Sequence, residues 1–240
     1  IRLSSHVNGV AKRHGEVSRD IWRTLWPERP ADAVPIGHIT NGVHLATWMA
    51  RDVMDLLDQR LGKNWGNRLD EPGIWDCVLS IDDGELWRVH HRMKRILMGF
   101  VREQARRRWA RQWKEAAHVV GAGTLLDPNA LTIGFARRFA TYKRANLIFE
   151  DLERLRELLI NQRRPVQLIF AGKAHPSDNP GKEILQTVYN FSRDPSLEGR
   201  VAFIEDYDLH VAHVLVQGVD LWMNLPRVPM EASGTSGMKA

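Results

Sequence analysis

The second half of the chain alternates short apolar runs with stretches of helical spacing, and no other feature restricts the fold as much. The apolar runs fit strands at 131–135, 166–171, 200–204 and 219–223, and helices are expected at 142–159, 179–191 and 210–217. Short apolar strands that alternate with helices are typical of a parallel sheet wound in βαβ units, because helices cover both faces. We therefore predict an α/β fold with a parallel sheet and flanking helices.

The first half predicts helices and connecting segments. Residues 1–30, punctuated by Gly9 and Gly15, fit a short helix, a break and a second short helix. A further helix is expected from Val53 to Leu61, and a long one from about Asp83 to Val120. The sheet is thus expected to follow a helical segment.

The long helix combines an apolar stripe with a cationic face. The stripe includes Leu86, Val89, Met93, Ile96, Leu97, Phe100, Val101, Trp109 and Trp113. The other face carries Arg88, Arg92, Lys94, Arg95, Arg102, Arg106, Arg107, Arg108, Arg111 and Lys114. Cations interleaved with tryptophans suit nucleic acid, but tryptophans on the apolar stripe face inward and cannot stack on bases. A solvated helix face is therefore the favoured interpretation.

Charge and cysteine content exclude several classes of protein. The net charge of +5 allows an anionic ligand without implying nucleic acid. The single cysteine, Cys77, excludes an internal disulfide and a cysteine-based metal cluster, and we expect it to be buried or half-buried. His6 and His14 lack a third ligand at metal-binding spacing, so no metal site is predicted. No apolar run reaches about 18 residues and no signal sequence is present, so we expect a soluble, cytoplasmic protein without membrane contact.

The stretch Met230-Glu-Ala-Ser-Gly-Thr-Ser-Gly-Met-Lys239-Ala240 is the strongest candidate for a binding site. A helix that begins near Ser233 would direct its first amides at an anion, most often a phosphate. The spacing fits neither Gly-x-x-x-x-Gly-Lys-Ser/Thr nor Gly-x-Gly-x-x-Gly. Spacing alone therefore leaves two interpretations open, an anion site and a glycine-rich turn with an exposed lysine.

Charged residues follow every predicted strand. The first strand is followed by Arg137, Arg138, Lys143 and Arg144, and the second by Lys173 and His175. The third strand is followed by Glu205-Asp206-Tyr207, and the fourth by Glu231 and the glycine-rich turn. The carboxyl ends of parallel strands meet in one crevice, where ligands of such sheets bind. This convergence favours a site for two phosphate groups.

These segments resemble those of the α-glucan phosphorylases, the glycogen, starch and maltodextrin phosphorylase family. Glu231–Lys239 resembles the segment that binds pyridoxal 5′-phosphate, and Gly134-Phe-Ala-Arg-Arg-Phe-Ala-Thr-Tyr-Lys-Arg144 resembles the basic segment that holds the substrate phosphate. Thr40-Asn-Gly42 resembles the crossing between the two domains. The likeness runs in order along essentially the whole chain, which is therefore expected to be a central fragment of such a protein.

The resemblance implies a two-domain glycosyltransferase architecture of the GT-B type, built from Rossmann-like domains. Residues 1–40 would be the end of the first domain and the crossing segment, 41–130 a helical segment, and 131–240 the first, truncated part of the cofactor-binding domain. The implied activity is reversible phosphorolysis of the terminal α-1,4-linked glucose of glycogen or maltodextrin to α-glucose 1-phosphate. The 5′-phosphate of the cofactor would be the proton relay, and the fragment alone is expected to be inactive.

The resemblance also implies roles for individual residues. The catalytic group would be Lys239, Arg138 and Lys143, with Lys239 forming the covalent link to pyridoxal 5′-phosphate. Residues around the cofactor would be Gly234, Thr235, Ser236, Gly237, Tyr207, Trp48, Arg137 and Lys143. Residues that bind orthophosphate or the sugar would be Arg138, Asn41, Glu231, Ser233 and Gly234.

Two alternatives to a phosphorylase remain open from the sequence. One is a nucleotide-sugar glycosyltransferase of the same GT-B architecture, in which the glycine-rich turn would hold a diphosphate. The other is a basic nucleic-acid-binding helical module. The expected partners of the favoured enzyme are an α-1,4-glucan and orthophosphate, with no nucleic acid and no membrane, and the resemblance allows a homo-oligomer.

Overall fold

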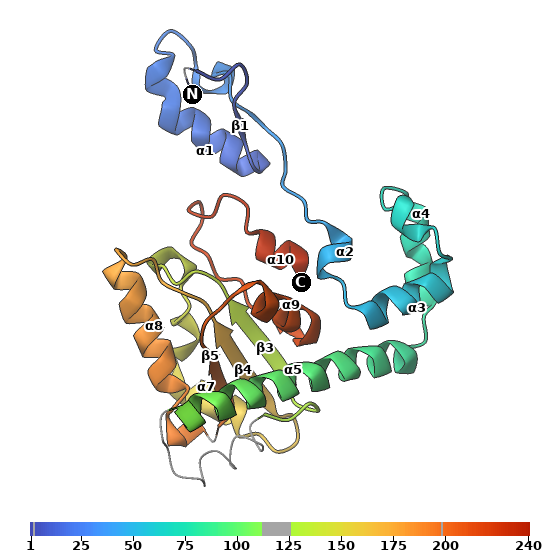
Figure 1. Ribbon diagram of the computed structural model, residues 1–240. Coiled ribbons are helices and arrows are strands. Elements are labelled where there is room, and N and C mark those ends of the chain that lie inside the picture. The colour runs from blue at the N-terminus through green and yellow to red at the C-terminus, as the bar shows by residue number, and fades with distance from the viewer. Residues whose placement is uncertain (2, 112–125, 198) are drawn as a thin grey trace.

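A computed structural model describes the chain except for residues 2, 112–125 and 198 (Figure 1). The strands are β1 Asn8–Gly9, β2 Gly37–His38, β3 Leu131–Ala136, β4 Val166–Ala171, β5 Val201–Ile204 and β6 Leu221–Trp222. The α-helices are α1 Lys12–Trp22, α2 Leu45–Trp48, α3 Arg51–Leu61, α4 Pro72–Asp76, α5 Asp83–Arg111, α7 Leu152–Leu159, α8 Asn179–Phe191, α9 Leu209–Gly218 and α10 Thr235–Lys239.

The predicted parallel sheet is confirmed. It has the strand order β5-β4-β3-β6, and every neighbouring pair is parallel. In the register of β3 and β4, Leu131 lies opposite Val166 and Ala136 opposite Ala171. The chain therefore forms a mixed α/β structure in which the strands of this four-stranded sheet present their carboxyl ends at the same edge.

Alternate residues of the strands are buried against different helices. Ile169 and Ala171 of β4 belong to a core that includes side chains of α5 and α9. Leu168 and Phe170 belong to a second core, with side chains of α7 and α8. Figure 1 shows these helices on the two sides of the sheet. Burial on both faces explains why the strands are continuous apolar runs.

The turn after β4 depends on a glycine. Gly172 has a φ of 147°, and a Cβ at this position would lie 2.0 Å from the carbonyl oxygen of Arg137. The close approach lets the two segments pair, because the amide of Phe139 donates a hydrogen bond to the carbonyl oxygen of Lys173 at 2.9 Å. The segment after β4 thus runs beside the segment after β3.

The N-terminal region forms a small unit in which β1 and β2 pair in parallel beside α1 (Figure 1). The prediction of two short helices in residues 1–30 is wrong, because α1 is one helix that continues through Gly15. The packing of α1 favours a glycine at position 15, because a Cβ there would lie 2.9 Å from the carbonyl oxygen of Gly37. The glycine therefore marks close packing of α1 on β2 and not a break.

The predicted helix at 142–159 is also shorter than expected. Its first part consists of the 3₁₀ turns Thr141–Lys143 and Leu147–Phe149, and regular helix begins only at Leu152. Arg144 has a left-handed backbone with a φ of 53°, which interrupts a helix. The Asp151 side chain then accepts a hydrogen bond from the amide of Arg154 at 3.0 Å and caps the new start.

Other expectations are corrected or fall outside the described residues. The strand predicted at 219–223 is limited to Leu221–Trp222. Cys77 is exposed, because it lies at the start of a 3₁₀ turn on the surface. The helix predicted to reach Val120 is described to Arg111, and the part from 112 onward, with Trp113 and Lys114, lies outside the description, as does the side chain of Trp109.

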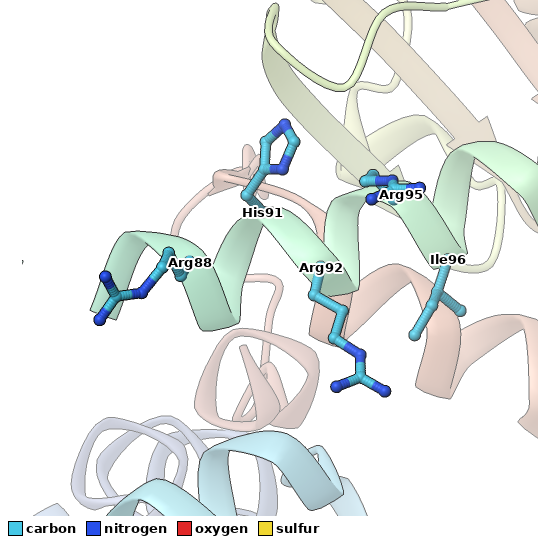
Figure 2. A pocket seen from close by; sticks show the side chains of 5 residues that line it. All are labelled: Arg88, His91, Arg92, Arg95 and Ile96. Carbon is cyan, nitrogen blue, oxygen red and sulfur yellow. The ribbon is translucent and has the colours of Figure 1, made fainter. Parts of the chain in front are cut away.

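The cationic face of α5 is only partly solvated. Arg88, Arg92 and Arg95 border a shallow surface pocket with His91 and Ile96, and their side chains point in different directions in Figure 2. Leu86 and Ile96, expected on the buried stripe, are 45% and 55% exposed. Lys94 is the clearest exception, because it is 1% exposed and therefore does not belong to the solvated face.

Candidate active site

The carboxyl end of β3 opens onto a pocket that collects most of the predicted site residues. It is lined by Ala136, Arg137, Arg138, Lys143, Tyr207, Glu231, Ala232, Ser233, Gly234, Thr235 and Ser236. Ala136 is the last residue of β3, and the other residues follow β3, β5 and β6 in the chain. Lys173 and His175, which follow β4, are not among the lining residues. Their segment is held beside Phe139 instead, so the predicted convergence holds for three strand ends.

Glu231 is the centre of the charge arrangement in the pocket. Its carboxylate accepts from Arg137 at 2.9 Å and also from Lys143. The side chains of Arg137 and Lys143 are only 5% and 9% exposed. Two nearly buried cations thus share one carboxylate, and the positive charge exceeds the negative charge. Such a site favours an anion.

Arg138 adds a third cation on the open side of the pocket. It is exposed, and its guanidinium lies 3.4 Å from the hydroxyl oxygen of Tyr142, which accepts from it. Because this is a long contact to a neutral group, the guanidinium keeps donors for a ligand. The pocket is therefore lined by an exposed arginine as well as by the segment that precedes α10.

The segment before α10 contributes hydroxyl groups that have no partner. Ser233 Oγ and Ser236 Oγ are buried and form no hydrogen bond among the described residues. Buried hydroxyl groups are normally satisfied, so these two indicate a polar ligand. The predicted start of the helix at Ser233 is moved to Thr235, because Gly234 has a left-handed backbone with a φ of 68°.

Lys239 lies at the end of α10 and beside Trp48. Its Nζ is 4.1 Å from the centroid of the Trp48 ring, a cation–π contact. Neither residue lines the pocket, but Thr235 and Ser236 on the same helix do. At about 1.5 Å of rise per residue, Lys239 lies about one helical turn beyond these residues.

Asn41 and Gly237, like Trp48 and Lys239, are not among the residues that line the pocket. Asn41 is in the segment between β2 and α2, and its backbone N–H donates to the carbonyl oxygen of Val10 at 3.0 Å. Gly237 lies inside α10, where a Cβ would be 3.5 Å from Nδ2 of Asn224. Asn41 is therefore outside the pocket lining, whereas Gly237 directly follows the lining residue Ser236.

Tyr207 forms part of the wall between the pocket and the core. Burial raises the pKa of its phenol, and the nearby charge of Arg137 lowers it by less. The phenol is thus neutral at pH 7 and keeps its proton as a hydrogen-bond donor.

Sequence reasoning missed Asn224, which follows β6. Its Oδ1 accepts a hydrogen bond from Arg137, so it holds that guanidinium toward Glu231. The signal that could have identified Asn224 is its position directly after the strand predicted at 219–223, where ligands of parallel sheets bind.

Within the described residues, no group of three or more His, Cys, Asp or Glu side chains is arranged to hold a metal ion. Over the same residues, no helix combines the length and the apolar character needed to cross a membrane.

A parallel α/β sheet with a cationic pocket beyond its strand ends defines the general class of α/β proteins that bind anionic ligands. A comparison with protein families makes the class specific. The model of the family described as carbohydrate phosphorylase matches residues 1–240, and the chain belongs to this family.

Known relatives agree with this assignment. The chain is 46% identical over 240 residues to a glycogen phosphorylase of Aquifex aeolicus, and 45% identical to a maltodextrin phosphorylase of Thermococcus litoralis. It is 41% identical to a glycogen phosphorylase of Mycobacterium tuberculosis. In each case all of this chain is aligned, but it spans only 34%, 28% and 28% of the relatives' length. These matches favour the phosphorylase prediction over a nucleotide-sugar glycosyltransferase or a nucleic-acid-binding module.

Proposed function

We propose that the chain forms the cofactor- and phosphate-binding part of an α-glucan phosphorylase. The carrying observation is one pocket lined both by Arg137, Arg138 and Lys143 and by the segment Glu231–Ser236, with Arg137 and Lys143 paired to Glu231. In this proposal residues 1–40 end one domain of a GT-B architecture and cross to the next, 41–130 form a helical segment, and 131–240 begin the Rossmann-like cofactor domain. The activity is phosphorolysis of a terminal α-1,4-linked glucose to α-glucose 1-phosphate.

The residues present fit pyridoxal 5′-phosphate. The unpartnered hydroxyls of Ser233 and Ser236 and the excess positive charge suit a phosphate group. Lys239 supplies an amine for covalent attachment to the aldehyde, and Trp48 supplies an aromatic wall beside that amine. Gly234, Thr235 and Gly237 would approach the phosphate through their backbone, and Tyr207 would contact the ring. When bound, the cofactor supplies a phosphate group able to give and take a proton.

The other polar residues would bind the substrates. Arg138 and Lys143 would hold orthophosphate, and their charges would stabilise two phosphate groups brought close together. Glu231, Ser233 and Gly234 would bind hydroxyl groups of the terminal glucose. Asn41, which is not among the residues that line the pocket, would also bind a sugar hydroxyl group.

Cofactor binding and phosphorolysis test the proposal separately. Titration of the 240-residue chain with pyridoxal 5′-phosphate, followed by borohydride reduction and peptide mass analysis, should give a single fixed adduct. The longest reading frame that contains this sequence should form glucose 1-phosphate from maltodextrin and orthophosphate. A protein that binds the cofactor without forming glucose 1-phosphate would limit the proposal to binding, and failure of both assays would refute it.

Arg138→Ala is expected to lower kcat/KM for orthophosphate by about 10²–10³-fold, because it removes a fixed cation from the site of phosphate charge. Affinity for the glucan should change little. The matched control is Lys173→Ala, which removes a cation from the segment after β4 that does not line the pocket. Phosphorolysis kinetics at varied phosphate measure the effect, and unchanged phosphate kinetics in the Arg138 variant would remove this role.

A further inference from the structure

The Trp48 indole is contacted by two segments that are distant from it in the sequence. The ring of His213, on α9, meets it edge-to-face, with centroids 4.6 Å apart and planes at 76°. Lys239, on α10, places Nζ 4.1 Å from its centroid. Figure 1 shows the short helix α2, which ends at Trp48, near α9 and α10. The indole of Trp48 therefore lies in contact with both α9 and the Lys239 amine.

Helix α9 holds Trp48 in two ways. Besides the ring of His213, the side chain of Gln217 donates from Nε2 to the backbone carbonyl oxygen of Trp48 at 3.1 Å. His213 and Gln217 are four residues apart and thus lie on the same face of α9. Helix α2 has only four residues, and a helix this short is not stable by itself. The position of Trp48 therefore depends on these contacts.

The His213 side chain is placed for ring packing. Its Nε2 is buried and has no hydrogen-bond partner among the described residues. An unpaired buried nitrogen opposes folding, whereas an edge-to-face aromatic pair favours it. The edge-to-face contact with Trp48 is thus a favourable interaction of this ring.

We propose that His213 is a positioning residue that fixes the Trp48 indole against Lys239. Through Trp48, it sets the surroundings of the amine that reacts with the cofactor. The link to the cofactor rests on the proposed function above. The contact between Trp48 and the Lys239 amine does not depend on that proposal, and this contact can be measured on the chain without any cofactor.

The first test measures the acetylation rate of Lys239 by a limiting amount of acetic anhydride, read by peptide mass. His213→Ala should release the indole and raise the rate about two- to tenfold, toward the rate of Trp48→Ala. The matched control is His210→Ala on the same helix, which removes an edge-to-face ring contact to Phe100, with centroids 5.3 Å apart and planes at 81°. This control should leave the Lys239 rate unchanged.

Two further variants separate positioning from a general loss of stability. His213→Phe keeps a ring and removes the unpaired nitrogen, so it should restore the slow rate. In a Trp48→Ala background, His213→Ala should have no additional effect, because the proposed route runs only through the indole. Equal rates in the wild type and His213→Ala, or an additional effect in the Trp48→Ala background, would overturn the proposal.

The second test uses pyridoxal 5′-phosphate with the same variants. His213→Ala should weaken binding about two- to tenfold and alter the circular dichroism of the cofactor band, and His213→Phe should restore both. A wild type that binds no cofactor contradicts the proposed function and removes the link to the cofactor, while the acetylation result still decides the positioning role. A wild type that binds normally, with His213→Ala indistinguishable from it in both tests, contradicts the inference alone.

Discussion

Asp220→Ala is expected to lower the free energy of unfolding by about 3–5 kcal/mol, because it leaves the buried Lys94 ammonium without its counter-charge. Lys94 is 1% exposed, and its Nζ lies 2.5 Å from Oδ2 of Asp220. It also donates to the carbonyl oxygen of Ala130 at 2.8 Å. Urea unfolding of the 240-residue chain, followed by circular dichroism, measures the change.

The size of the effect follows from the number of groups that share Asp220. Besides Lys94, its carboxylate contacts Nε2 of His90 at 2.7 Å and accepts from the amide of Thr132 at 2.7 Å. The network joins α5 to the starts of β3 and β6. Removal of the carboxylate therefore leaves a buried cation without its counter-charge and a backbone amide without its acceptor.

A charge-free replacement is the control for this prediction. Lys94→Met combined with Asp220→Leu should be much more stable than Asp220→Ala alone, because no buried charge remains unpaired. Arg88→Ala, on the exposed part of the same helix, should change stability by less than about 0.5 kcal/mol. If Asp220→Ala and Arg88→Ala were equally stable, the buried pair would have no structural role.

The same carboxylate gives stability a dependence on acid. Burial favours a higher pKa for Asp220, but hydrogen bonds from His90, Lys94 and the amide of Thr132 outweigh it and lower the pKa below its ordinary value. Its contribution is therefore present above the ordinary pKa of an aspartate, about 3.9, and is lost as the pH falls through the lower pKa of the folded state. Asp220→Ala should lack this part of the acid-induced loss of stability.

This network shows where sequence reasoning failed. Lys94 has cationic neighbours along α5, and nothing in the local pattern distinguishes it from Arg92 or Arg95. Its partner is 126 positions away in the sequence. Only the packing of α5 on the sheet brings the two together, and periodicity contains no information about that pairing.

The sheet and the pocket were more accessible to prediction. Strand ends are encoded locally, so the apolar runs before Arg137 and Glu231 were sufficient to place these residues at one edge of the sheet. The contact between Trp48 and Lys239 was not available from spacing, because the two lie on helices separated by the whole sheet domain in sequence. Resemblance to a family supplied that expectation, and the cation–π geometry agrees with their proximity.

Lys239→Ala is expected to abolish the borohydride-fixed adduct with pyridoxal 5′-phosphate, because it removes the amine that would form the covalent link to the aldehyde. Lys239→Arg is the matched variant. It keeps a cation for the contact with Trp48 but cannot form the same covalent link. Both variants should lack the adduct, and only Lys239→Ala should also lose the cation–π contact.

The comparison of the two variants identifies what the lysine contributes. Absorbance of the bound cofactor, borohydride fixation and peptide mass report the covalent link, while thermal unfolding of the cofactor-free chain reports the contact with Trp48. Lys173→Ala, at a strand end outside the pocket lining, should label as the wild type does. An adduct that persists at full stoichiometry in Lys239→Ala would assign the attachment to another amine, with Lys143 in the pocket as the first to test. The segment before α10 would then hold an anion without the lysine that follows it.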